Sequence, residues 1–286
     1  MSFAERVTSL PRLGLGVSTE YGAGDAMGSL DVLALRDRHP RYAGFLEVGV
    51  EAAKGLDRYA RAWAARGLPT TYHYLDVNLD EPEDFDDVWL DDVRAIAGVL
   101  QPAWMCGDAG LWHLGRRERG HMLLLPPVLT PESADGIADG VARLRAATAY
   151  DVFPENPPGQ VFLGDMHILD FFARVGERAD TGLLLDCAHL AMFQRLRGHD
   201  PLTALDGFPL ERVVELHVAG GSERQTDGFS WVEDAHTPNV LPDTWRIVEH
   251  VVPRTPNLKA VVFECERNPV TACLPGLARL AALFPP

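Results

Sequence analysis

The sequence has few cysteines, and their spacing argues against two common structural roles. The four are Cys106, Cys187, Cys265 and Cys273, and no two of them form a C-x-x-C pair. A thiolate zinc site is therefore not indicated, and so few thiols in 286 residues do not make a dense disulfide framework. We interpret them as reduced thiols of a cytoplasmic protein.

Positive charge is also scarce. The chain has 26 Lys and Arg residues against 41 Asp and Glu residues, which gives a net charge of −15. This balance argues against nucleic acid and against an anionic membrane surface as partners. It is compatible with binding cations or a basic peptide.

Long apolar runs are missing as well, because charged residues interrupt each of them. No membrane span is predicted, since a span needs roughly 20 predominantly apolar residues. The amino-terminal residues Met1 to Arg6 lack the basic and then apolar pattern of a signal peptide. Gly14-Leu15-Gly16 lacks the third glycine of a dinucleotide fingerprint. No linker or low-complexity segment divides the chain, so we expect one domain over residues 1–286.

The sequence does contain seven short apolar runs that end in an acid or a histidine. The terminal residues are Glu47, His73, Asp108, Glu155, Asp186, His217 and Glu264. A short apolar run bounded by turn signals is typical of a buried strand in a parallel sheet. The carboxyl ends of such strands converge on one mouth when the sheet closes into a barrel. Because these groups would repel and desolvate one another, we expect a cluster of metal ions between them.

The alternation of strands and helices predicts an α/β fold, specifically a (β/α)₈ TIM barrel of the xylose-isomerase-like type. Thr130 is expected to cap a helix whose first residue is Pro131. Strands are expected at 13–17, 43–48, 70–73, 103–106, 151–155, 181–186, 212–218 and 259–264. Helices are expected at 29–38, 56–66, 89–100, 131–147 and 166–175.

Two close pairs add to the strand-end residues. Asp186 and His189 stand three positions apart, and Asp234 and His236 stand two apart. We expect both pairs to lie in loops, where a carboxylate and an imidazole can bind one ion or bridge neighbouring ions. Mixed oxygen and nitrogen ligands suit iron, manganese or zinc.

Several of these segments together resemble a known family, the multinuclear non-heme iron-dependent oxidative enzymes. That family includes the methanobactin B-type and thiaglutamate-pathway peptide oxidases. The resemblance extends from Gly14 to Glu264 and is carried, in order and approximate spacing, by Glu155-Asn156-Pro157, Leu183-Leu184-Leu185-Asp186, Glu215-Leu216-His217-Val218-Ala219-Gly220, Asp234-Ala235-His236 and Phe263-Glu264.

The resemblance implies a barrel holding two to three iron ions in mixed Fe(II) and Fe(III) states. Such enzymes use O₂ to modify a Cys, Asp or Asn side chain of a ribosomally synthesised precursor peptide, often with a small partner protein that delivers the peptide. The resemblance also implies that Asn156 is a metal ligand or a hydrogen-bond donor to one of the metal ligands. The metal ligands that it implies are His73, Asp108, Glu155, Asp186, His189, His217, Asp234, His236 and Glu264.

The sequence also departs from the family pattern. The histidine expected near the first strand is absent from Ser18 to Tyr21, and the stretch Glu47 to Ala52 keeps its acids but has Gly49 in place of a histidine. Ala109 and Gly221 replace two further histidines. We expect Glu20 or Glu51 to supply a replacement oxygen ligand, with Glu51 favoured because it matches a family acid, as Glu47 does. The alternative is that Glu20 and Glu51 are surface acids.

Two other functions remain open. A divalent-metal barrel with isomerase-like or endonuclease-like activity would use Mn²⁺, Zn²⁺ or Mg²⁺ without redox chemistry. A catalytically inactive, peptide-binding barrel would account for the missing histidines. Five histidines outside the motifs are expected at the surface or behind the site: His39, His113, His121, His199 and His250.

Overall fold

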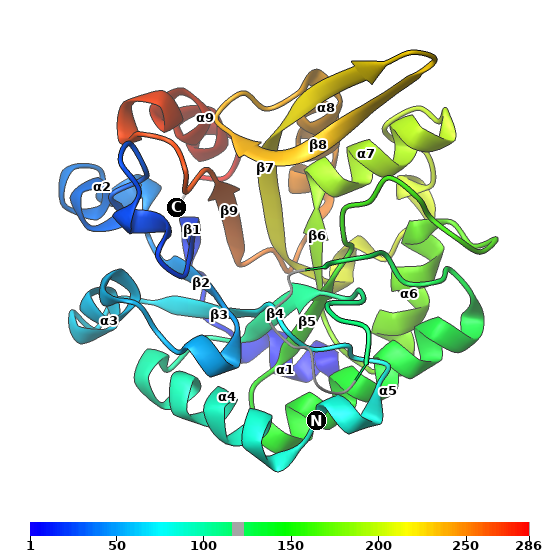
Figure 1. The fold of residues 1–286 in the computed structure, drawn as a ribbon, viewed down its shortest axis with the longest axis horizontal. Coiled ribbons are helices and arrows are strands. Elements are labelled where there is room, and N and C mark those ends of the chain that lie inside the picture. The colour runs from blue at the N-terminus through cyan, green and yellow to red at the C-terminus, as the bar shows by residue number, and fades with distance from the viewer. Residues whose placement is uncertain (116–122, 286) are drawn as a thin grey trace.

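A computed structural model describes residues 1–115 and 123–285. Eight parallel strands form a ring with helices outside it (Figure 1). Each strand pairs with the next in the order β1-β2-β3-β4-β5-β6-β7-β9, and β9 pairs with β1 to close the barrel. The predicted (β/α)₈ barrel is therefore confirmed. The strands are β1 (Gly14–Glu20), β2 (Leu46–Val50), β3 (Thr70–Tyr74), β4 (Met105–Asp108), β5 (Val152–Glu155), β6 (Leu183–Asp186), β7 (Val213–Thr226) and β9 (Ala260–Glu264).

The five predicted helices start and stop close to their expected positions, whereas the helices Cys187–Arg197, Pro242–Val251 and Val270–Leu283 were not predicted. Thr130 caps its helix as expected, because its side chain accepts a hydrogen bond from the backbone N–H of Ser133 at 3.3 Å. In the described ranges no helix has the length and apolar character needed to cross a membrane. The outer helices are α2 (Val32–Arg38), α3 (Arg58–Ala65), α4 (Asp87–Leu100), α5 (Pro131–Thr148), α6 (Ile168–Arg178), α7 (Cys187–Arg197), α8 (Pro242–Val251) and α9 (Val270–Leu283).

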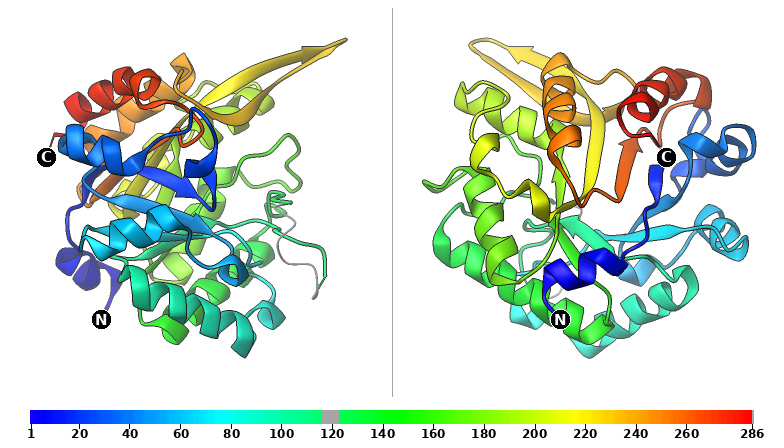
Figure 2. Two further views of the ribbon diagram at one scale, coloured as in Figure 1. Left: turned by 60° about the vertical axis from the view of Figure 1, so that its left-hand side comes forward. Right: turned by 180° about the vertical axis from the view of Figure 1, so that it is seen from behind.

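The amino-terminal end of the barrel is closed by a short helix, α1 (Phe3–Ser9), which lies across it in the rear view (Figure 2). Phe3 of this helix packs in one buried cluster with Phe45, Trp104 and Phe153 of the barrel. The amino-terminal end of the barrel is therefore sealed by apolar side chains.

One strand was not predicted. β7 continues past the barrel to Thr226, and β8 (Phe229–Thr237) returns antiparallel to it, so the pair forms a hairpin that projects from the barrel (Figure 2). The turn is Asp227-Gly228, with Gly228 in the left-handed region at φ +82°, which glycine adopts without a steric cost. The expectation that Asp234 and His236 lie in a loop is wrong, because both are on β8.

A glycine sets how closely α5 packs on the barrel. A Cβ added at Gly140 would lie 1.8 Å from the carbonyl oxygen of Leu79, whereas a Cβ at Gly98 in α4 would meet no heavy atom within 4 Å. We expect Gly140→Ala to lower the free energy of unfolding by about 1–3 kcal/mol, because the backbone must move. The control Gly98→Ala should raise it by up to about 1 kcal/mol. Chemical denaturation measures both, and equal stabilities would contradict this packing.

Candidate metal centre

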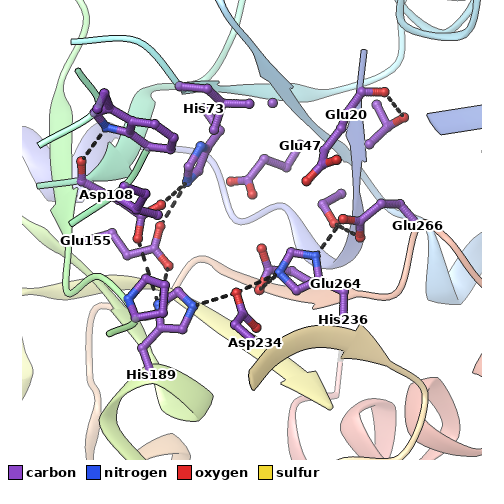
Figure 3. Close-up of a pocket in the computed structure, with 17 residues that line it drawn as sticks. Glu20, Glu47, His73, Asp108, Glu155, His189, Asp234, His236, Glu264 and Glu266 are labelled. Carbon is purple, nitrogen blue, oxygen red and sulfur yellow. Dashed lines mark hydrogen bonds and ion pairs between the residues drawn. The ribbon is translucent and has the colours of Figure 1, made fainter. Parts of the chain in front are cut away.

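Acids and imidazoles from separate strands meet at the carboxyl end of the barrel. A cavity of about 350 Å³ opens there, with several of these side chains in its wall (Figure 3). Their convergence follows from the parallel strands, which all end at this edge. The last residues of β4, β5, β6 and β9 are Asp108, Glu155, Asp186 and Glu264, and β3 and β7 contribute His73 and His217.

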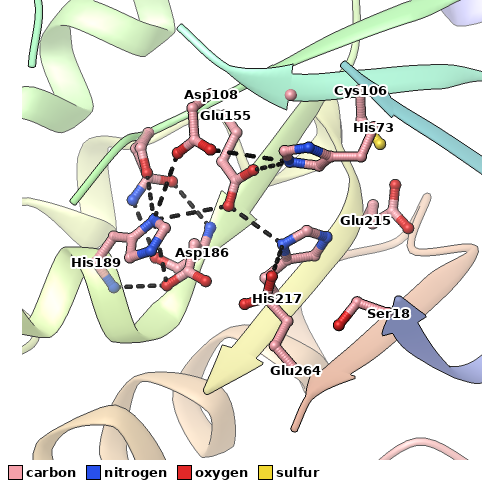
Figure 4. A network of polar contacts seen from close by, with 12 residues as sticks. Ser18, His73, Cys106, Asp108, Glu155, Asp186, His189, Glu215, His217 and Glu264 are labelled. Carbon is pink, nitrogen blue, oxygen red and sulfur yellow. Dashed lines mark hydrogen bonds and ion pairs between the residues drawn. The ribbon is translucent and has the colours of Figure 1, made fainter. Parts of the chain in front are cut away.

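Glu155 lies at the centre of the group. Its Oε2 is 2.9 Å from His73 Nε2, and its Oε1 is 3.2 Å from His217 Nδ1 (Figure 4). The side chain is 1% exposed. We call Glu155, His73, Asp108 and His217 the inner donor group. The two carboxylate oxygens of Glu155 therefore face different imidazoles.

Asp186 and His189 lie at a helix start and not in the loop that the sequence suggested. Asp186 caps α7 by accepting a hydrogen bond from the backbone N–H of His189 at 2.5 Å. Asn156 holds this junction, because its side-chain amide accepts from the N–H of Asp186 at 2.9 Å and donates to its carbonyl at 3.0 Å. The carbonyl of Asn156 lies 2.9 Å from His189 Nδ1. Nδ1 is therefore the donating nitrogen, and Nε2 is available to the cavity.

The hairpin supplies the other side of the cavity. Asp234 Oδ2 is 3.2 Å from Nε2 of His189 and 3.2 Å from Nε2 of His236. Glu264 Oε2 is 3.9 Å from the same nitrogen of His236. We call His189, Asp234, His236 and Glu264 the outer donor group. It joins to the inner group through Glu264, whose Oε1 is 3.3 Å from His217 Nδ1.

Unpartnered polar atoms gather in these two groups. Within the described residues, buried side-chain atoms without a hydrogen-bond partner include Asp108 Oδ1, Glu155 Oε1, Asp186 Oδ2, both ring nitrogens of His217, Asp234 Oδ1 and Glu264 Oε2. Such atoms are costly to bury, and metal ligation is one way to satisfy them. Three-residue sets with donor atoms within 4.8 Å of one another include His73 with Asp108 and Glu155, and Glu155 with Asp186 and His189. These residues therefore fit metal ions with oxygen and nitrogen ligands.

The pKa values of these buried side chains also favour a bound cation. Burial alone would lower the pKa of His73, but the hydrogen bond to Glu155 and the charge of Glu47 raise it to about 9. Burial, and then the charge of Glu155, raise the pKa of Asp108 to about 8. Burial would raise the pKa of Glu155, but His217 and His73 outweigh it and lower that pKa. The crowded carboxylates raise the pKa values of one another, and a further cation among them would offset this effect.

The three additional acids that the sequence suggested differ in their positions relative to the cavity. Glu20 lines the cavity and forms an ion pair with Arg267 at 2.7 Å. Glu51, which the sequence favoured, is absent from the cavity wall and pairs with Lys54 Nζ at 2.5 Å. Glu47 also lines the cavity, with its Oε1 3.0 Å from His217 Nε2, and its donor atom lies within 4.8 Å of those of His73 and His217.

Two buried acids were missed in the sequence. Glu266 lies in the cavity wall, 2.5 Å from His236 Nδ1. Its signal is the spacing Glu264-Cys265-Glu266, because alternate residues of an extended segment share a face. Glu215 is fully buried below His217, and Trp104 Nε1 donates to it at 2.6 Å. Of the five histidines expected outside the site, His121 lies outside the described residues, and the described ones are not in the cavity wall: His39, His113, His199 and His250.

The fold is that of a xylose-isomerase-like TIM barrel. A xylose isomerase-like TIM barrel protein from Mycobacterium smegmatis, solved in complex with magnesium, aligns with a TM-score of 0.60 at 11% identity over 97% of both chains. The TTHB071 protein from Thermus thermophilus, soaked with ZnCl₂, aligns with a TM-score of 0.53 at 19% identity over 94% of this chain and 98% of that one. At these identities the likeness concerns the fold alone.

The family follows from sequence comparison. Residues 30–280 match the family model of the RiPP precursor modification enzymes MbnB/TglH/ChrH, and the chain belongs to this family. A UPF0276 protein of Anaeromyxobacter is 24% identical over 221 residues, covering 76% of this chain and 75% of the relative. A UPF0276 protein of Vibrio parahaemolyticus is 27% identical over 184 residues, covering 62% of each chain. The resemblance stated from the motifs is thereby confirmed.

Proposed function

We propose that this protein is an iron- and O₂-dependent oxidase that modifies a Cys, Asp or Asn side chain of a ribosomally synthesised precursor peptide. A peptide substrate is implied by membership of a RiPP precursor modification family. The observation that carries the proposal is the cluster of unpartnered buried oxygen and nitrogen atoms beside the cavity. Ligands of this mixed type suit iron.

Two metal positions would be built from the two donor groups. His73, Asp108, Glu155 and His217 would hold one, and His189, Asp234, His236 and Glu264 the other, with Asp186 behind His189. Iron bound there would supply reduction of O₂ and Lewis-acid binding of a thiolate or carboxylate. Glu155 and Glu264 each face imidazoles of neighbouring ligands, so their carboxylates would keep the two positions adjacent.

The other residues of the site would orient the metal ligands and limit the access of water to them. The Asn156 carbonyl holds His189 Nδ1, and α1 with its aromatic neighbours seals the barrel from below. Leu75, Trp112, Leu124 and Pro158 provide the apolar part of the cavity wall. A substrate side chain entering from the carboxyl end would displace water from this wall and meet the donor groups on the other side.

The reaction is tested by co-expressing the protein with short peptides encoded beside its gene, and by measuring peptide mass with and without O₂. The proposal predicts an O₂-dependent mass change confined to a Cys, Asp or Asn residue, which is lost when Zn²⁺ replaces iron. Repeating the co-expression together with the genes of small proteins encoded nearby tests whether a partner protein delivers the peptide. Turnover of a sugar or nucleic acid by the Mn²⁺ or Mg²⁺ form without O₂ would contradict the proposal and favour the isomerase-like or endonuclease-like alternative.

A further inference from the structure

His236 is held by a carboxylate that belongs to neither donor group. Glu266 Oε1 is 2.5 Å from His236 Nδ1, on the side of the ring opposite Nε2 (Figure 3). The other ring nitrogen, Nε2, faces Asp234 and Glu264. The two nitrogens of this imidazole therefore have separate neighbours, and only one of them is directed at the outer donor group.

We propose that Glu266 is a positioning residue that accepts a hydrogen bond from the Nδ1–H of His236 and so leaves Nε2 unprotonated for metal binding. His189 offers the parallel case, because its Nδ1 is held by the Asn156 carbonyl while its Nε2 faces Asp234. The two histidines differ in the group behind them, since one has a neutral carbonyl and the other a carboxylate. A carboxylate behind an imidazole fixes its tautomer and makes the opposite nitrogen a stronger donor.

Glu266 is itself fixed from two directions. Its side chain is 2% exposed, and Ser18 Oγ of β1 donates to its Oε2 at 3.1 Å. Its backbone carbonyl accepts a hydrogen bond from the N–H of Leu30 at 2.9 Å. The carboxylate is therefore anchored to the barrel before any ligand is bound.

The backbone of His236 supports the same assignment. Its φ is +44°, in the left-handed region that residues with a side chain seldom adopt. Asn268 Nδ2 donates to the His236 carbonyl at 2.7 Å, so the segment after β9 holds this residue through both its backbone and its ring. A strained backbone conformation persists where the surrounding contacts fix it. Here those contacts direct Nε2 of His236 toward the outer donor group.

A competing arrangement uses the same residues as ligands. Glu20, His236 and Glu266 place donor atoms within 4.8 Å of one another, so they could surround an ion of their own. Two contacts argue for positioning instead. Glu20 Oε2 is taken by Arg267 at 2.7 Å, and the Nδ1 of His236 is already hydrogen-bonded to Glu266.

The test titrates the metal-free full chain with Co²⁺ and follows visible absorption, which reports affinity and coordination. We expect Glu266→Ala to weaken binding at one position by about 10–100-fold and to leave the other unchanged. Glu266→Gln keeps an acceptor for Nδ1 but loses the charge, so its affinity and spectrum should lie between those of Glu266→Ala and the wild type. The matched control Glu20→Gln, in the same wall, should bind as the wild type does.

The outcomes separate this role from the function on which it rests. Wild-type affinity in both Glu266 variants would overturn the positioning role while leaving the proposed metal centre intact. Equal weakening by Glu20→Gln and Glu266→Gln would overturn it in favour of ligation by both acids. No Co²⁺ binding by the wild-type protein would overturn the proposed metal centre as well.

Discussion

Glu155→Ala is expected to empty the inner donor group of metal and to lower turnover by more than about 100-fold, because changes behind metal ligands alone cost about 10–100-fold. Its carboxylate contacts both His73 and His217, so its loss separates the two imidazoles that it joins. Glu155→Gln keeps the volume but not the charge, and should lose less metal. Elemental analysis of each purified variant, followed by the peptide assay, measures the effect.

The control for this experiment is Glu211→Ala, which removes an exposed acid on the 3-10 turn before β7. It should retain full metal content and turnover. Full metal content in both Glu155 variants would show that the inner donor group is not a metal site.

His217→Ala is expected to have the largest effect on the folding of the metal-free protein. The imidazole is fully buried, with Glu47, Glu155 and Glu264 oxygens at 3.0, 3.2 and 3.3 Å. Removing one partner of a buried ion pair costs about 3–5 kcal/mol, because the charges left behind have no compensation. We therefore expect the free energy of unfolding, measured by chemical denaturation, to fall by about that amount.

The matched variant is His199→Ala, which removes an exposed imidazole at the end of α7 and should change stability by less than about 0.5 kcal/mol. If His217→Ala were equally mild, the imidazole would not be the cation that balances these carboxylates. Metal content of His217→Ala, assayed in parallel, should fall whether or not stability does, since the variant lacks one of the proposed ligands of the inner group.

The barrel could be predicted because its signal is local. Runs such as Leu183 to Asp186 are apolar, short and bounded by turns, and the rule that parallel strands end at one edge then brings their last residues together. The same rule accounts for the meeting of Asp108, Glu155 and Glu264.

The hairpin was harder to predict because its strand has no apolar run. Phe229 to Thr237 alternates irregularly, and most of its residues are partly exposed. The Asp227-Gly228 turn was the available signal, and pairing with β7 decides the rest.

The accessory acids depended on neighbours distant in sequence. Glu20 lies in the cavity wall and pairs there with Arg267, which is 247 positions away in the sequence. Glu266 became a candidate only when β8 brought His236 to it. Such contacts form between separate elements, and residue spacing does not encode them.

The central claim is a multinuclear iron centre, and the most direct test is anaerobic purification followed by elemental analysis and exposure to O₂. The two donor groups predict more than one iron per chain and an absorbance change when O₂ is admitted, because both positions offer oxygen and nitrogen ligands. Zinc alone would contradict the iron centre. Less than about half an equivalent of any transition metal per chain would contradict a site in which each donor group holds one ion.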